Sequence, residues 1–111
     1  MIDSYDFGRI VINGKRYNTD LIVFSGKVRG WWRKEGHRLH VEDLKDVLEI
    51  KPEVLVVGAG YSGLMMVPPE TRRYVESEGI EVIVQKTAEA CETFNRLVKS
   101  RKAVATLHLT C

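Results

Sequence analysis

The glycine-rich segment 58–63 is the first candidate for chemistry. Its sequence, Gly-Ala-Gly-Tyr-Ser-Gly, follows an apolar run and matches the G-x-G-x-x-G pattern, in which glycines let the backbone approach a pyrophosphate at a helix N-terminus. Two observations argue against a nucleotide here. Pro68-Pro69 excludes a continuous helix after the loop, and the next apolar run ends on Gln85 and Lys86 instead of an acidic residue for the ribose. We therefore expect no cofactor.

A second interpretation keeps this loop as a small-molecule or anion site. Backbone amides at the carboxyl edge of a parallel sheet can bind a small anion, and nearby basic side chains can line the same cleft. A serine-hydrolase elbow is excluded because Leu64 stands where that motif requires glycine. We find no set of residues with a catalytic arrangement in the sequence. This favours a non-enzymatic role, but an enzyme stays an alternative. The candidate ligand residues are Arg33, His37, Gly58, Gly60, Ser62 and His108.

Histidine and cysteine also occur in two pairs with a spacing of three. His37 precedes His40, and His108 precedes Cys111, so a four-ligand metal site is conceivable. In extended chain, however, residues three apart point to opposite faces, and neither pair converges. We expect no metal.

A basic and aromatic segment spans residues 27–40. It contains five basic residues against one acidic residue, and its two tryptophans are adjacent. Such a mixture could bind nucleic acid through phosphate contacts and base stacking, but no nucleic-acid fold signature accompanies it and the net charge of the chain is only +2. We favour a protein-interaction surface. Its candidate residues are Arg29, Trp31, Trp32 and Arg38.

The elements that must position these residues begin with a β-hairpin. Strand-like runs at 7–12 and 15–24 flank Asn13-Gly14, a dipeptide that favours a tight turn because both residues tolerate positive φ. Residues 25–40 have no regular period, so we predict a mainly extended loop there.

Helices and strands then alternate along the chain. Continuous apolar runs predict strands at 54–57, 80–84 and 103–107. Apolar periodicity, a proline start and a glycine end predict helices at 41–49, from Pro69 to Gly79, and from Thr87 to about residue 98. The order ββαβαβαβ indicates an α/β fold with a mostly parallel sheet, and 111 residues suit one domain, residues 1–111.

Composition narrows the class of protein. An apolar fraction of 44% and a charged fraction of 29% are typical of a globular protein, and no apolar run is long enough to cross a membrane. Two cysteines, Cys91 and Cys111, are too few for a disulfide framework, so we expect free thiols and a cytoplasmic location.

The ordered set of short motifs resembles the adipogenesis-associated domain family, which also includes a mitochondrial respiratory complex I assembly factor. The residues that carry the resemblance are Trp32-Arg33 with Gly36-His37, Gly58-Ala59-Gly60 with Ser62, Val67-Pro68, Gly79-Ile80-Glu81-Val82, Thr87 with Ala90, Phe94-Asn95 with Leu97, and His108-Leu109-Thr110-Cys111. The resemblance implies three layers, with a central mixed sheet, N-terminal β-structure on one side and helices on the other. It implies no catalytic residues. We expect a non-enzymatic interaction or assembly module with a protein partner; a homodimer is one form of this, and ligand binding and nucleic-acid binding are the alternatives.

Overall fold

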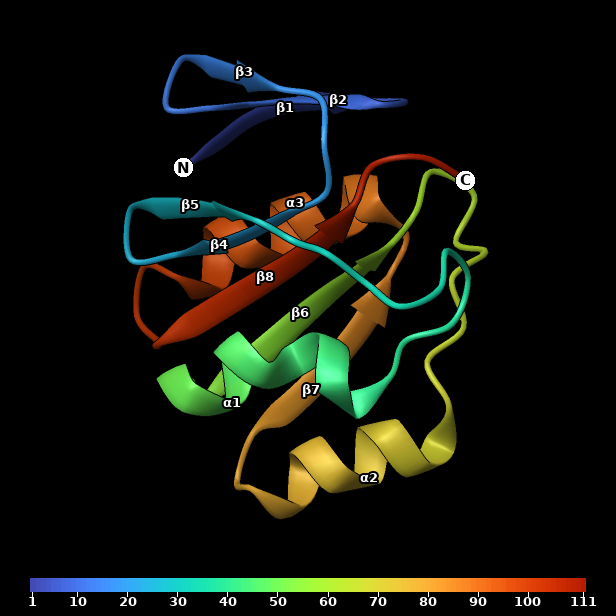
Figure 1. Ribbon diagram of the computed structural model, residues 1–111. Helices are drawn as coiled ribbons and strands as arrows, with labels where there is room; N and C mark the ends of the chain where they lie inside the picture. The colour runs from blue at the N-terminus through green and yellow to red at the C-terminus, as the bar shows by residue number, and fades with distance from the viewer.

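The computed structural model describes residues 1–111 and contains two β-sheets, three α-helices and one short 3-10 helix (Figure 1). The smaller sheet is antiparallel and has the order β1-β2-β3. Its strands are β1 (Ile2–Asp6), β2 (Arg9–Ile12) and β3 (Lys15–Tyr17). The predicted hairpin turn is confirmed, since Asn13 and Gly14 have φ values of 49° and 80° between β2 and β3. Sequence analysis missed β1, whose sequence, Ile-Asp-Ser-Tyr-Asp, is largely polar.

The larger sheet has five strands in the order β5-β4-β8-β6-β7. They are β4 (Leu21–Phe24), β5 (Lys27–Gly30), β6 (Val54–Ala59), β7 (Glu81–Gln85) and β8 (Ala103–His108). β6 pairs in parallel with β7 and β8, whereas β4 pairs antiparallel with β5 and β8. The predicted strand 15–24 is therefore two strands in different sheets. The predicted loop 25–40 begins with a second hairpin, whose turn at Ser25-Gly26 has positive φ at both residues.

The helices form where periodicity and caps predicted them. The first is a 3-10 turn, η1 (Val41–Leu44), that continues into α1 (Lys45–Ile50); the others are α2 (Pro69–Ser77) and α3 (Thr87–Leu97). Pro69 occupies the first turn of α2, and Gly79 follows the end of that helix with φ of 82°. No helix in the structure is long and apolar enough to span a bilayer.

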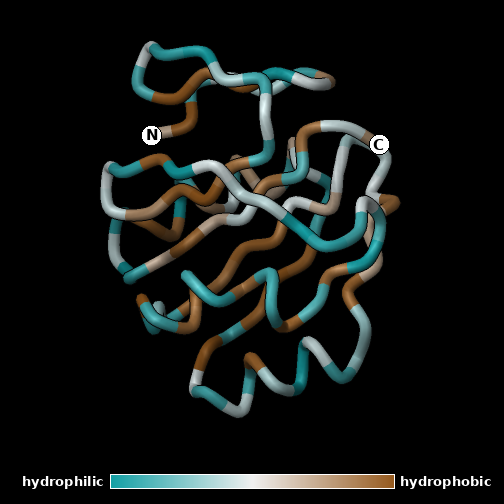
Figure 2. Tube along the Cα trace, viewed as in Figure 1, coloured by the Kyte–Doolittle hydropathy of each residue, from teal (hydrophilic) through white to brown (hydrophobic).

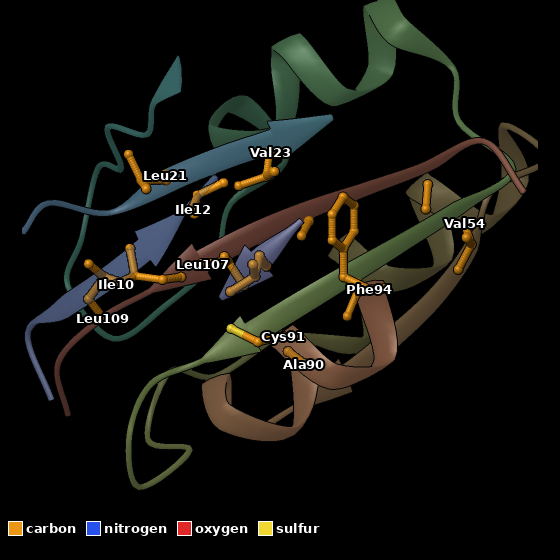
Figure 3. Packing of buried hydrophobic residues seen from close by; sticks show 14 residues of the cluster. Ile10, Ile12, Leu21, Val23, Val54, Ala90, Cys91, Phe94, Leu107 and Leu109 are labelled. Carbon is orange, nitrogen blue, oxygen red and sulfur yellow. The ribbon is translucent and has the colours of Figure 1, made fainter. Parts of the chain in front are cut away.

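Two apolar clusters cover the two faces of the larger sheet. The first packs β4, β6 and β8 against both the smaller sheet, which contributes Ile10 and Ile12, and α3, which contributes Phe94 (Figure 3). The second packs the opposite face against α1 and α2, through residues such as Val47 and Val75. Successive strand residues alternate between the clusters, as a two-residue period requires. Figure 2 shows the resulting concentration of hydrophobic chain in the central strands.

The mixed α/β fold with a central sheet is confirmed, but one detail of the expected layers is wrong. The helices do not all lie on one side, because α3 shares a face with the N-terminal sheet. The physical reason is the handedness of the connections. The β6–α2–β7 and β7–α3–β8 crossovers run in opposite directions across the sheet, so right-handed connections place α2 and α3 on opposite faces.

The two cysteines are free, and Cys91 is buried.

Candidate functional site

Three polar side chains meet where one end of the larger sheet joins the loops. Asp20 precedes β4, Arg33 follows β5, and His108 ends β8. The strand register brings them together, since Leu21 pairs with Gly30 on one side and with Leu107 on the other. We call Asp20, Arg33 and His108 the polar cluster.

The members of the polar cluster are close and largely buried. Arg33 Nη2 donates to Asp20 Oδ2 at 2.6 Å, and His108 Nδ1 lies 2.8 Å from the same oxygen. The second carboxylate oxygen, Oδ1, accepts the Leu109 amide at 2.9 Å. Arg33 and His108 side chains are each 7% exposed and Asp20 is 18% exposed. The carboxylate is thus fully hydrogen-bonded, which is the condition under which a buried charge is tolerated.

The position of the ring proton on His108 follows from this geometry. Its Nε2 is buried and has no partner, so a proton there would be an orphaned donor. Nδ1 lies beside the Asp20 carboxylate, which is an acceptor only. We therefore assign the tautomer in which Nδ1–H donates to Asp20, and Arg33 Nη2, 2.8 Å from Nδ1, contributes charge to the cluster without a hydrogen bond to that nitrogen.

Arg33 also holds the loop in which it lies. Its Nη1 donates to the carbonyl oxygens of Glu35 and Gly36, at 3.1 and 2.6 Å, and lies 3.2 Å from Met65 Sδ. One guanidinium therefore ties the end of the sheet to loop 33–36 and to the segment after β6. This arrangement is typical of a structural anchor, because both terminal nitrogens of the guanidinium donate to protein acceptors, whereas Nε has no partner.

The glycine-rich loop is joined to the polar cluster through Thr87. The hydroxyl of Thr87 accepts the Gly60 amide at 2.9 Å and donates to the His108 carbonyl at 2.6 Å. The amides of Tyr61 and Gly63 donate to the carbonyls of Thr110 and Gly60. These amides are occupied by protein acceptors, so they do not form an open anion-binding nest in this structure.

The other predicted ligand residues lie apart from the polar cluster. Gly58 is buried in β6, where a Cβ would come within 2.9 Å of Thr87 Oγ1. His37 and Ser62 are exposed, and neither side chain makes a hydrogen bond; His37 is held only through its carbonyl, which accepts the Met66 amide at 2.7 Å. Three hollows, of about 180, 430 and 560 Å³, are found in the molecule, and none is lined by any of these residues or by Arg33 and His108.

The residues predicted to form an interaction surface do not form one in the structure, because one of them is buried. Trp31 is buried and its indole N–H donates to the Asp43 carbonyl at 2.8 Å, so the expectation of an exposed Trp31 is wrong. Alternation along extended chain turns Trp31 into the second apolar cluster and leaves Trp32 81% exposed. Arg29 and Arg38 are exposed, in ion pairs with Asp46 and Glu70.

The structure reveals a second exposed feature that sequence analysis did not single out. Phe7, Tyr61 and Leu64 are each more than half exposed, and the rings of Phe7 and Tyr61 are in edge contact, with centroids 5.7 Å apart. Phe7 lies on the β1–β2 turn, and the other two lie on the turn after β6. We call these three residues the turn surface. Its signal in the sequence is a large apolar side chain beside glycine in a tight turn, where polar residues are the rule.

The ionised form of Asp20 makes stability depend on pH. Burial raises the pKa of Asp20, but the hydrogen bonds from His108, the Leu109 amide and Arg33 outweigh it and lower that pKa below its ordinary value. A lowered pKa gives stability above the unfolded-state pKa, and this is lost as pH falls through the folded-state value. We expect the stability advantage of the natural chain over Asp20→Asn to shrink as pH falls below about 4. Urea unfolding of both chains between pH 7 and pH 2 measures this difference in stability. A difference that stays constant over this range would contradict the lowered pKa of Asp20.

The sequence is similar to that of a curated protein. A Xenopus tropicalis protein, NADH dehydrogenase (ubiquinone) 1 alpha subcomplex assembly factor 3, is 30% identical over 106 residues, which cover 94% of this chain and 57% of that protein. The chain thus spans little more than half the length of this relative. The resemblance to a complex I assembly factor is confirmed, whereas the adipogenesis-associated name is not supported by these matches.

Solved structures share the fold across the whole chain. The crystal structure of a conserved hypothetical protein from Pyrococcus horikoshii OT3 is 29% identical, with a TM-score of 0.91, and the match covers 100% of this chain and 99% of that one. A Bartonella henselae protein described as an outer membrane protein is 26% identical, with a TM-score of 0.84, and the match covers 99% and 94% of the two chains. A family model described as a protein of unknown function matches residues 2–108. The chain therefore belongs to the DUF498/DUF598 family.

Proposed function

We propose that the chain is an interaction or assembly module that binds a partner protein through the turn surface. The observation that carries this proposal is the exposure of Phe7, Tyr61 and Leu64 on adjacent turns, at positions where folding favours polar residues. Large aromatic side chains of this kind dominate the energetics of protein interfaces. The relative named as an assembly factor supports the same class of role.

The polar cluster fits this proposal as a device that positions the surface. Thr87 and Arg33 link it to the segments that carry Tyr61 and Leu64. Rigid display of exposed aromatic groups lowers the entropy lost on binding. A ligand-binding or catalytic role is less well supported, because the cluster has no adjoining hollow and its charges are satisfied internally.

Sheet edges offer little alternative for partner binding. On the β7 edge, the Val82 carbonyl is occupied by Arg72, which donates to it at 2.8 Å. On the β1 edge, the Asn95 side-chain amide accepts from the N–H of Ile2 and donates to the carbonyl of the same residue. The β3 and β5 edges are short and carry Lys and Arg, which discourage strand addition. Side chains on the turns are therefore the better contact surface.

Nucleic-acid binding through residues 27–40 is also less well supported. Arg29, Lys34 and Arg38 each form an ion pair with a carboxylate, and Arg33 is buried in the polar cluster. Few cations of that segment remain free to neutralise phosphates.

The cytoplasmic location and the homodimer stay predictions.

The test is affinity capture from native extract with the natural chain and the double variant Phe7→Ser/Tyr61→Ser. We expect a saturable protein partner whose recovery falls at least about 30-fold in the variant, since one hot-spot truncation costs about 2 kcal/mol. Tyr74→Ser is the matched control, because Tyr74 is a half-exposed aromatic residue on α2 outside the turn surface. Equal recovery with all three chains, or no partner at all, would overturn the proposal.

A further inference from the structure

The shape of the turn surface limits what can bind it. Phe7 and Tyr61 lie on turns that project at the edge of the molecule, beside the C-terminal segment (Figure 1). Neither residue, nor Leu64, lines any of the three hollows. The three side chains stand outside the hollows, although Asp6 and Arg9, on either side of the Phe7 turn, line one of them; a partner that packs around the three side chains must therefore supply the concave side.

Besides the exposed Asp6–Arg9 ion pair, the charged side chain that borders the turn surface is the cation of Lys86. Asp6 is the only carboxylate on the two turns, and Arg9 pairs with it at 3.4 Å; residues 60–66 carry no charge. Lys86 is exposed and forms no ion pair. Its aliphatic stem packs on Gly63, where a Cβ would lie 3.2 Å from Lys86 Cγ. The unpaired ammonium thus borders the turn that carries Tyr61 and Leu64.

Resting on the proposed function, we infer that the partner is a folded protein that receives Phe7 and Tyr61 in an apolar pocket, with a carboxylate on the rim of that pocket facing Lys86. A flexible peptide is disfavoured because Phe7, Tyr61 and Leu64 line none of the three hollows and so give a peptide no groove walled by apolar side chains of the turn surface. The carboxylate supplies orientation and association rate more than affinity, as rim charges generally do.

The experiment uses the full chain with Phe7→p-benzoylphenylalanine, a photoreactive side chain of similar character, in native extract. Cross-linked peptides are sequenced and located on the partner structure. The charge is tested with Lys86→Glu, and Lys99→Glu is the matched control, an exposed and unpaired lysine beyond the opposite end of β8. We expect Lys86→Glu to lower the cross-link yield about tenfold and Lys99→Glu to leave it within about twofold.

The possible outcomes separate this inference from the proposed function. Cross-links inside an apolar pocket with an acidic rim, together with the loss in Lys86→Glu alone, support the inference. Cross-links to a flexible segment or to lipid, or equal yields for both lysine variants, overturn the inference about the partner's pocket. In that case the dependence of capture on Phe7 and Tyr61 still supports the interaction module. The absence of any specific cross-link, with capture unaffected by Phe7→Ser/Tyr61→Ser, overturns both.

Discussion

Replacing Arg33 by methionine is expected to lower the free energy of unfolding by about 3–5 kcal/mol, because it leaves the buried carboxylate of Asp20 without its cation. Methionine retains most of the side-chain length, so the loss reports charge and hydrogen bonds more than packing. The Arg33 guanidinium contacts Asp20 at 2.6 Å and also bonds two carbonyls of its own loop. Urea unfolding at neutral pH, followed by circular dichroism, measures the change.

Arg29→Met is the matched control for this prediction. Arg29 also pairs with an aspartate, at 3.2 Å, but its side chain is 56% exposed. An exposed ion pair contributes at most about 1 kcal/mol, so this variant should be close to the natural chain in stability. Similar losses in the two variants would show that the polar cluster is not a special source of stability.

The central elements of the fold were predictable from local patterns. The β6, β7 and β8 strands follow from continuous apolar runs, and α2 and α3 follow from helical periodicity with recognisable ends. Errors occurred where tertiary context overrides local pattern. The run 15–24 reads as one strand, but it divides between two sheets because its halves pair with β2 and β8.

The candidate site was only partly predictable for the same reason. Arg33 and His108 were selected by residue type, and the structure places them in contact. Asp20 was missed because it lies 88 residues from His108 in sequence and meets it only through the β4–β8 register. Trp31 was misplaced because an irregular segment gives no period from which to tell its buried face from its exposed one.

Gly60 occupies a position that has no room for a side chain. Its φ is 105°, in a region that side chains rarely adopt, and an added Cβ would lie 2.5 Å from the carbonyl oxygen of Thr110 and 2.8 Å from the carbonyl carbon of Cys111. Backbone strain alone costs about 1–3 kcal/mol at such positions, and the clash with backbone adds to it. We expect Gly60→Ala to lower the free energy of unfolding by at least about 3 kcal/mol, measured by urea unfolding.

Gly14→Ala separates the two causes of this loss. Gly14 also has positive φ, at 80°, but an added Cβ there meets nothing within 4 Å, so this variant should show only the strain, about 1 kcal/mol. If the two variants lose equal stability, residues 110–111 can move away from the added Cβ without loss of free energy, and they do not hold the loop. If Gly60→Ala loses much more, close backbone packing at Gly60 fixes the turn that carries Tyr61. Partner capture should then fall together with stability in Gly60→Ala and not in Gly14→Ala, because only the first substitution displaces the turn surface.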